Sequence, residues 1–206
     1  KGRLILPQAQ AVRAALDLGA VAVVARETEY LAALAKLSAP PDLVVCDSQV
    51  VDRMVAETPP VVRCTTFSIL LARLKGDLPE MVKAARIIDD LKDGDRILIG
   101  EACSHHALED DIGRKKIPRW LREKTGKSLR IDVVAGRDWP ADLAAYRLAI
   151  HCGGCMLTRR EMLNRLQGAG ARGVPLTNYG VAIAHLKGVL PRVLEPFPES
   201  LAALGG

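Results

Sequence analysis

Short apolar runs alternate along the chain with longer stretches whose apolar residues recur at helical spacing. The stretch 27–37, for example, carries Leu31, Leu34 and Leu37 on one helical face. Apolar runs of about four residues between helices of about ten residues predict a parallel sheet with helical crossovers. In this first part the predicted strands are 4–6, 21–24, 43–46 and 61–64, and the predicted helices are 8–18, 27–37 and 49–57.

Two successive helices, predicted at 68–75 and 79–91, interrupt this alternation. The turn signal Gly76-Asp77-Leu78-Pro79 lies between them. We therefore expect a domain boundary at residue 78, with one domain over 1–78 and a second over 79–206.

Strands and helices alternate again in the second part, and we expect the tail 191–198 to be extended. The fold class predicted for the whole chain is α/β, with two small domains that each contain a mainly parallel sheet flanked by helices. In the second part the predicted strands are 96–99, 129–134, 148–150 and 174–176, and the predicted helices are 111–124, 142–146, 159–167 and 179–187.

The composition excludes several classes of protein. Of the 206 residues 49% are hydrophobic, but no run approaches the roughly 18 apolar residues that span a bilayer. The net charge is +5, yet the basic residues are dispersed and aromatic residues are few, so we expect neither nucleic acid nor membrane as a partner. Five scattered cysteines and the lack of a signal-peptide pattern indicate a reducing, cytoplasmic location.

The cysteines of the second part follow predicted strands. Cys103 comes after the strand 96–99, and Cys152 and Cys155 come after the strand 148–150. The carboxyl ends of parallel strands meet at one edge of a sheet, where ligands bind. Gly153-Gly154 lets backbone N–H groups approach the sulfurs, which tunes a metal centre. The pattern predicts a metal site with three thiolates.

Spacing alone leaves three kinds of site open. Zinc would be satisfied by the tetrahedral set Cys103, His105, Cys152 and Cys155. An iron–sulfur cluster would use the three cysteines and leave one iron for another ligand. Cys152 and Cys155 alone would serve a dithiol oxidoreductase, if the pair lay at a helix N-terminus that stabilises a thiolate.

The motifs around these cysteines resemble the HydF family of FeFe-hydrogenase maturation proteins. The shared pattern is Cys103-Ser104-His105, then 45 intervening residues, then His151-Cys152-Gly153-Gly154-Cys155. The flanking segments 1–8, 101–106 and 173–184 are also similar to the family, so the resemblance covers essentially the whole chain.

The resemblance implies a scaffold rather than an enzyme, in a family whose GTPase domain is absent from this chain. It implies that Cys103, Cys152 and Cys155 bind a 4Fe-4S cluster, and that the chain transiently carries a diiron precursor. The implied partners are a second copy in a homodimer, the FeFe-hydrogenase apoprotein and radical S-adenosylmethionine maturases. Residues 1–78 would form the dimerisation domain and residues 79–206 the cluster-binding domain.

Four further residues are candidates for the same site. His105 and His151 match the motif histidines and would either bind the metal or support its ligands through hydrogen bonds. Glu109 and Asp110 are carboxylates close to Cys103 in sequence, and one of them would supply a weak, displaceable ligand to the remaining iron.

The other candidate motifs have structural explanations. Thr125-Gly126-Lys127-Ser128 resembles the end of a phosphate-binding loop, but Leu121 replaces the required first glycine and a helix precedes it where a strand is needed. Cys46 and Cys64 lie in apolar strands and are predicted to be buried hydrophobic residues.

Overall fold

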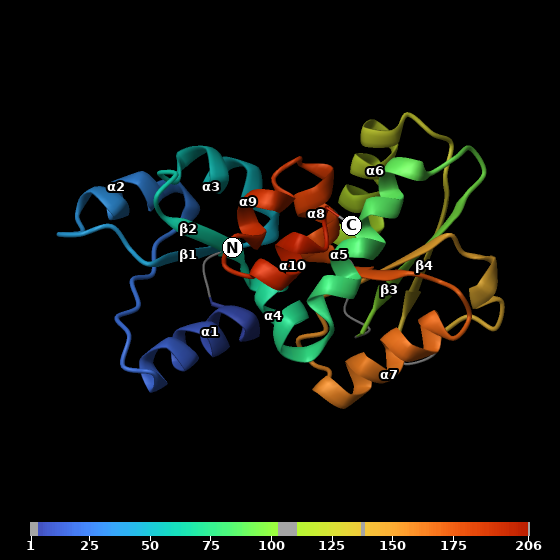
Figure 1. Ribbon diagram of the computed structural model, residues 1–206, viewed down its shortest axis with the longest axis horizontal. Coiled ribbons are helices and arrows are strands. Elements are labelled where there is room, and N and C mark those ends of the chain that lie inside the picture. The colour runs from blue at the N-terminus through green and yellow to red at the C-terminus, as the bar shows by residue number, and fades with distance from the viewer. Residues whose placement is uncertain (1–3, 103–110, 137–138, 206) are drawn as a thin grey trace.

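The computed structural model describes residues 4–102, 111–136 and 139–205, and within them two parallel sheets lie among helices (Figure 1). This arrangement confirms the predicted α/β class. The strands are β1 (Leu43–Cys46), β2 (Arg63–Thr66), β3 (Arg96–Glu101), β4 (Arg130–Ala135), β5 (Leu148–His151) and β6 (Leu176–Asn178). The helices are α1 (Leu6–Asp17), α2 (Tyr30–Ala35), α3 (Val51–Glu57), α4 (Phe67–Lys75), α5 (Leu78–Arg86), α6 (Ile117–Thr125), α7 (Arg159–Gly170), α8 (Tyr179–Leu186), α9 (Leu190–Leu194) and α10 (Pro198–Ala202). Short 3₁₀ turns lie at Glu27–Glu29, Ser48–Val50, Ile87–Asp90 and Leu143–Ala145, and a π turn lies at Ile112–Lys116.

The larger sheet has the strand order β4-β3-β5-β6, and every pairing is parallel. The chain passes from β3 through α6 to β4 on one side, and from β5 through α7 to β6 on the other. Because crossovers between parallel strands are right-handed, these two opposite steps place α6 and α7 on opposite faces of the sheet. Figure 1 shows α6 above the sheet and α7 below it.

The first part of the chain contains a smaller sheet than the sequence predicted. Among the described residues it pairs only β1 with β2, so the strands predicted at 4–6 and 21–24 are wrong. Leu6 begins α1 instead, since Pro7 in the first turn favours a helix start. The run 21–24 has strand-forming residues but no strand beside it in the described chain, and Val21 is 90% exposed.

The tail was also predicted wrongly as extended, because it forms α9 and α10. Pro191 and Pro198 occupy the first turns of these helices, where a backbone N–H has no helical partner to lose. Proline therefore begins two helices in the segment that was predicted to be extended.

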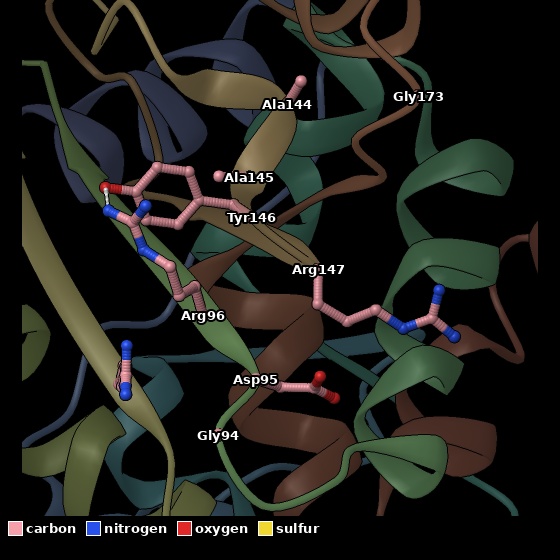
Figure 2. A pocket seen from close by; sticks show the side chains of 9 residues that line it. Gly94, Asp95, Arg96, Ala144, Ala145, Tyr146, Arg147 and Gly173 are labelled. Atoms are coloured by element: carbon pink, nitrogen blue, oxygen red, sulfur yellow. Dashed lines mark hydrogen bonds between the residues drawn. The ribbon is translucent and has the colours of Figure 1, made fainter.

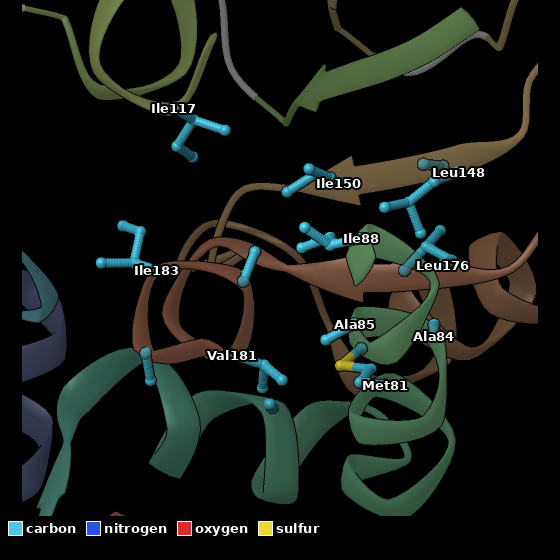
Figure 3. Packing of buried hydrophobic residues seen from close by; sticks show 14 of the residues in the cluster. Met81, Ala84, Ala85, Ile88, Ile117, Leu148, Ile150, Leu176, Val181 and Ile183 are labelled. Atoms are coloured by element: carbon cyan, nitrogen blue, oxygen red, sulfur yellow. The ribbon is translucent and has the colours of Figure 1, made fainter. Parts of the chain in front are cut away.

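One hydrophobic core joins both parts of the chain. It runs from Val51 and Cys64 in the first part, through Ile69 of α4, to the larger sheet. Figure 3 shows the portion where α5 and α8 pack against the sheet. The labelled side chains there are Met81, Ala84, Ala85, Ile88, Ile117, Leu148, Ile150, Leu176, Val181 and Ile183. No helix within the described ranges is long and apolar enough to cross a membrane.

Candidate metal centre

The carboxyl ends of β3 and β5 form the point where the strand order of the larger sheet reverses. These strands are neighbours, with Ile99 opposite Ile150 and Gly100 opposite His151. The connection after β3 leads to α6 on one face of the sheet, and the connection after β5 leads to α7 on the other (Figure 1). Open α/β sheets bind their ligands in the crevice outside the strand ends at such a reversal point.

Cys152 lies at this reversal point, beside the end of β3. Its backbone N–H donates to the Gly100 carbonyl at 2.8 Å, which extends the β3–β5 ladder by one bond. Its Sγ accepts a hydrogen bond from the backbone N–H of Ala102 at 3.2 Å. An N–H directed at sulfur stabilises negative charge there, and Ala102 immediately precedes Cys103 in the sequence.

The glycines between the two cysteines allow a tight loop. Gly154 has φ +61°, and a Cβ at this position would lie 2.5 Å from Cε of Met162. Its carbonyl accepts from the Leu157 N–H at 2.9 Å, which closes the turn. Cys155 is partly buried, and its thiol, like that of Cys152, is not part of a disulfide. The loop therefore presents two thiols that are not part of a disulfide at the sheet edge.

Neither cysteine lies in the first turn of the helix that follows. The N-cap of α7 is Thr158, whose Oγ1 accepts from the Glu161 N–H at 3.2 Å, while the Glu161 carboxylate accepts from the Thr158 N–H at 2.8 Å. The helix N-terminus is thus occupied by its own capping box, and it does not provide the thiolate stabilisation that a dithiol redox pair requires.

His151 is fully buried, and both of its ring nitrogens are engaged. Nε2 lies 2.8 Å from an Arg165 guanidinium nitrogen, and Nδ1 lies 2.6 Å from the Cys152 carbonyl oxygen. Arginine can only donate, so Nε2 accepts and Nδ1 carries the proton that it donates to the carbonyl. Burial, together with the charge of Arg165, lowers the pKa of His151 to about 4 and keeps the ring neutral, while the Cys152 hydrogen bond opposes that shift.

Arg165 is itself fixed by further contacts. It donates to the Gly136 carbonyl at 2.6 Å, and its guanidinium carbon lies 5.4 Å from the centre of the Trp139 ring. The same ring meets His151 edge-on at 6.0 Å. Gly100 makes room for both rings, since a Cβ there would lie 3.1 Å from Trp139. These contacts hold the imidazole, and with it the Cys152 carbonyl, in one orientation.

Glu101, Arg114 and Tyr179 form another group of polar side chains near Cys152. Glu101, only 2% exposed, pairs with Arg114 at 3.1 Å. The buried Tyr179 hydroxyl has no hydrogen-bond partner among the residues described. Burial raises the pKa of Tyr179, and the nearby Cys152 and Glu101 raise it further. Tyr179 therefore keeps its proton, and its hydroxyl is a hydrogen-bond donor in the neighbourhood of Cys152 and Glu101.

The structure places some of the predicted site residues and not others. Cys152, Cys155 and His151 lie together at the sheet edge, as described above. The remaining candidates, Cys103, His105, Glu109 and Asp110, lie outside the described residues. Within the described ranges no three metal-binding side chains gather.

Two residues at the site were missed from the sequence as functional candidates. Arg165 lies on α7, and its sequence position is typical of a charged side chain on the solvent-facing side of a helix. Tyr179 belongs to the segment 173–184 that carried the family resemblance. The available signal was an aromatic side chain at the first position of α8, directly before Gly180. Neither residue type is itself a typical ligand, so neither stood out.

The two cysteines of the first part have structural positions. Cys64 on β2 is fully buried and Cys46 on β1 is partly buried, and burial raises the pKa of both thiols. The segment 125–128 follows α6 and precedes β4, and Gly126 at φ +66° ends the helix. This is the reverse of the strand–loop–helix order that binds phosphates.

A recess of about 470 Å³ opens at the opposite, amino edge of the larger sheet (Figure 2). Arg96 lies in its wall and is held by two carboxylates, with Asp132 at 2.9 Å and Asp142 at 2.7 Å. Figure 2 shows the Arg147 side chain directed away from Arg96. The arginines do not converge on one point, so the cysteine crevice is the better candidate site.

The fold and the crevice define an α/β protein that presents cysteine thiols at the reversal point of a parallel sheet. Residues 79–196 match the family described as the hydrogen maturase F tetramerization domain, and residues 1–76 match the hydrogen maturase F dimerization domain. The chain belongs to the hydrogen maturase F (HydF) family, which confirms the resemblance seen in the sequence. A comparison with curated proteins gives no match. The matched domains support a role in hydrogenase maturation and an ability to self-associate.

Proposed function

We propose that this chain is a scaffold that binds a 4Fe-4S cluster through Cys103, Cys152 and Cys155 and carries a diiron precursor to the FeFe-hydrogenase apoprotein. The observation that carries the proposal is the position of Cys152. Its sulfur lies at the strand-order reversal and accepts a backbone N–H from the residue before Cys103. This hydrogen bond brings the residue before Cys103 to the sulfur of Cys152, which shares a short loop with Cys155.

The described residues fit such a cluster in their chemistry. Thiolates are the usual ligands of iron–sulfur clusters, and backbone N–H groups directed at sulfur stabilise them. A cluster held by three cysteines supplies one iron whose remaining coordination position is open to exchange. The chain's own residues orient the Cys152 end of the loop through His151 and Arg165, and Tyr179 offers an O–H donor beside it.

The cargo in this proposal is the diiron precursor, which is received and released rather than chemically converted. Radical S-adenosylmethionine maturases would supply it, and the hydrogenase apoprotein would accept it. The scaffold would act as a homodimer through its first part, in agreement with the dimerization-domain match over residues 1–76. No catalytic group is required of this chain in such a role.

Anaerobic reconstitution with iron and sulfide tests the cluster. Single Cys103→Ser, Cys152→Ser and Cys155→Ser variants are expected to lose the iron, the sulfide, the visible absorbance and the EPR signal of the reduced cluster. The matched control is Cys46→Ser, since Cys46 is also a partly buried free thiol but lies in the first part of the chain. This control is expected to retain the cluster.

Three outcomes would contradict the proposal. Spectra like those of the unmutated chain in all three variants would remove the cysteines from the site. One zinc ion per chain without sulfide would indicate a structural or interaction module. A reversible Cys152–Cys155 disulfide with no metal requirement would indicate a dithiol oxidoreductase.

A further inference from the structure

Helix α4 belongs to the region matched by the dimerization domain, yet one of its faces lies against the second part of the chain. Ser68, Leu71 and Lys75 recur at positions i, i+3 and i+7, which is one stripe along a helix. The helix contacts α7, α8 and β6. In Figure 1 it lies between the small sheet and the large one. A helix of one matched domain thus forms part of the surroundings of the other.

The first end of the stripe is anchored to the start of α8. The Asn178 side chain donates to the Ser68 carbonyl at 2.8 Å, and the Gly180 N–H donates to Ser68 Oγ at 3.1 Å. A Cβ at Gly180 would lie 2.5 Å from Cβ of Ser68, so the two helices approach as closely as glycine permits. These contacts hold the Ser68 end of α4 in place and so determine the position of its other end, at Lys75.

The far end of the stripe contacts the loop that carries the two cysteines. A Cβ at Gly153 would lie 3.6 Å from a methyl group of Leu71. Lys75 Nζ donates to the Gly154 carbonyl at 3.1 Å and to the Cys155 carbonyl at 2.9 Å. In return, Arg159 donates to the Leu74 carbonyl at 2.6 Å, beside the last turn of α4.

We propose that Lys75 is a positioning residue for the Cys152–Cys155 loop, supplied to the metal site by the dimerization region. The inference rests on the proposed function of this loop as a holder of the cluster. Two adjacent glycines leave the loop backbone free to adopt many conformations, so an external restraint is needed to fix its thiols. The ammonium group of Lys75 holds two consecutive carbonyls at once, and it bridges 80 positions in sequence to reach Cys155.

The same ammonium group places a positive charge beside the cysteine loop. A nearby cation favours the more negative of two redox states, so it raises the reduction potential of an anionic cluster. Replacing Lys75 by methionine keeps an unbranched side chain of slightly shorter length but removes both the donors and the charge. The variant should therefore loosen the loop and shift the cluster potential to a more negative value.

Hydrogen exchange of the full chain, prepared reduced and without metal, tests the positioning directly. The Leu157 N–H is the reporter, because it donates to the Gly154 carbonyl that Lys75 also holds. In Lys75→Met this amide is expected to exchange about tenfold faster, since two charge-assisted hydrogen bonds no longer oppose local opening. The amides of β3 are expected to be unchanged.

Two further variants separate positioning from a general loss of stability. Lys75→Arg keeps the charge and the donors and is expected to restore both the slow Leu157 exchange and the cluster potential. Lys127→Met removes a lysine at an exposed position after α6 and is expected to change neither measurement.

Unchanged Leu157 exchange in Lys75→Met would overturn the proposal. A potential that shifts equally in Lys75→Met and Lys127→Met would also overturn it. If the unmutated chain takes up no iron, the proposed cluster function fails, but the exchange experiment on the metal-free chain still decides whether Lys75 positions the loop.

Discussion

At position 151 the imidazole accepts a hydrogen bond from Arg165 and donates one to the Cys152 carbonyl, so neither ring nitrogen is left for another partner. A neutral imidazole binds a metal through its unprotonated nitrogen, which here is the one that Arg165 occupies. Coordination by His151 would therefore require this buried pair to separate. The geometry favours the other role predicted for His151, hydrogen-bond support of a neighbouring ligand.

The ion pair between Asp132 and Arg96 makes the free energy of unfolding depend on pH in the acidic range. Hydrogen bonds from Arg96 and then from Tyr146 lower the pKa of Asp132 below its ordinary value of 3.8. On acidification the unfolded chain takes up this proton before the folded chain does. The stabilisation is therefore complete above the ordinary pKa and is lost as the pH falls through the lowered one.

Replacement of Asp132 by asparagine tests this pH dependence. Near neutral pH the Asp132→Asn variant is expected to lower the free energy of unfolding by at most about 1 kcal/mol, because the pair is half-exposed to solvent. The difference from the unmutated chain is expected to shrink below about pH 3.5. Urea unfolding at several pH values measures it, with Asp17→Asn on α1 as a control at an exposed ion pair. A difference that stays constant into acid would contradict the pKa argument.

At the scale of elements, the run 21–24 has the composition of a β-strand, but no neighbouring strand pairs with it among the described residues. Val21, Val23 and Val24 are 90%, 61% and 58% exposed. Valine favours strands because it packs well on a half-buried pleated surface, and no such surface covers this run within the described chain. The run lies within the region matched by the dimerization domain, so we expect a second copy of the chain to cover it.

A double substitution, Val21→Lys with Val23→Lys, tests this role in self-association. Two charges on a surface buried between copies cannot be solvated, so the variant is expected to weaken association by at least tenfold while the fold remains intact. Sedimentation over a range of concentrations measures the assembly, and circular dichroism checks the fold. Glu123→Lys, an equal change in net charge at an exposed position of α6, should associate normally. Normal assembly of the double variant would exclude the run from the interface.

Most elements could be predicted because their signals are local. The larger sheet follows from its apolar runs, and Cys152 and Cys155 lie at its edge because they directly follow the strand β5. The failure at 21–24 arose because the tendency to form a strand says nothing about whether a partner exists in the same chain. Lys75 and Arg165 were missed because their importance comes from carbonyls and a ring that are distant in sequence. Contacts between residues that are distant in sequence produce no periodic pattern of residue types along the chain.

At the scale of the whole molecule, the two matched domains share one core and a close helix contact. Core residues run without a break from β2 through α4 to the larger sheet. Hydrogen bonds also cross between the parts, for example from Lys116 to Gln49 at 2.8 Å and from Arg192 to the Val62 carbonyl at 2.6 Å. Continuous burial of this kind couples the opening of one part to the opening of the other, so we expect them to unfold together.

The contact between α4 and α8 provides a test of that coupling. A Cβ at Gly180 would lie 2.5 Å from Cβ of Ser68 and 3.2 Å from the backbone nitrogen of Ile69, so Gly180→Ala forces the helices apart. We expect a loss of about 1–3 kcal/mol in unfolding free energy, as for other overpacked contacts. Gly168→Ala is the control, because its Cβ would meet nothing closer than an arginine nitrogen at 3.9 Å. In α7 the added methyl group is expected to stabilise by about 0.5–1 kcal/mol.

Unfolding by denaturant, followed by far-UV circular dichroism and by tryptophan fluorescence, distinguishes coupled from independent parts. Trp120 and Trp139 both lie in the second part, whereas circular dichroism also reports the helices of the first. Coupled parts give coincident transitions that Gly180→Ala shifts by the same amount. Independent parts would give a fluorescence transition separate from that of circular dichroism. Coincidence would mean that the loop holding Cys152 and Cys155 keeps its shape only while the dimerization region is folded against it.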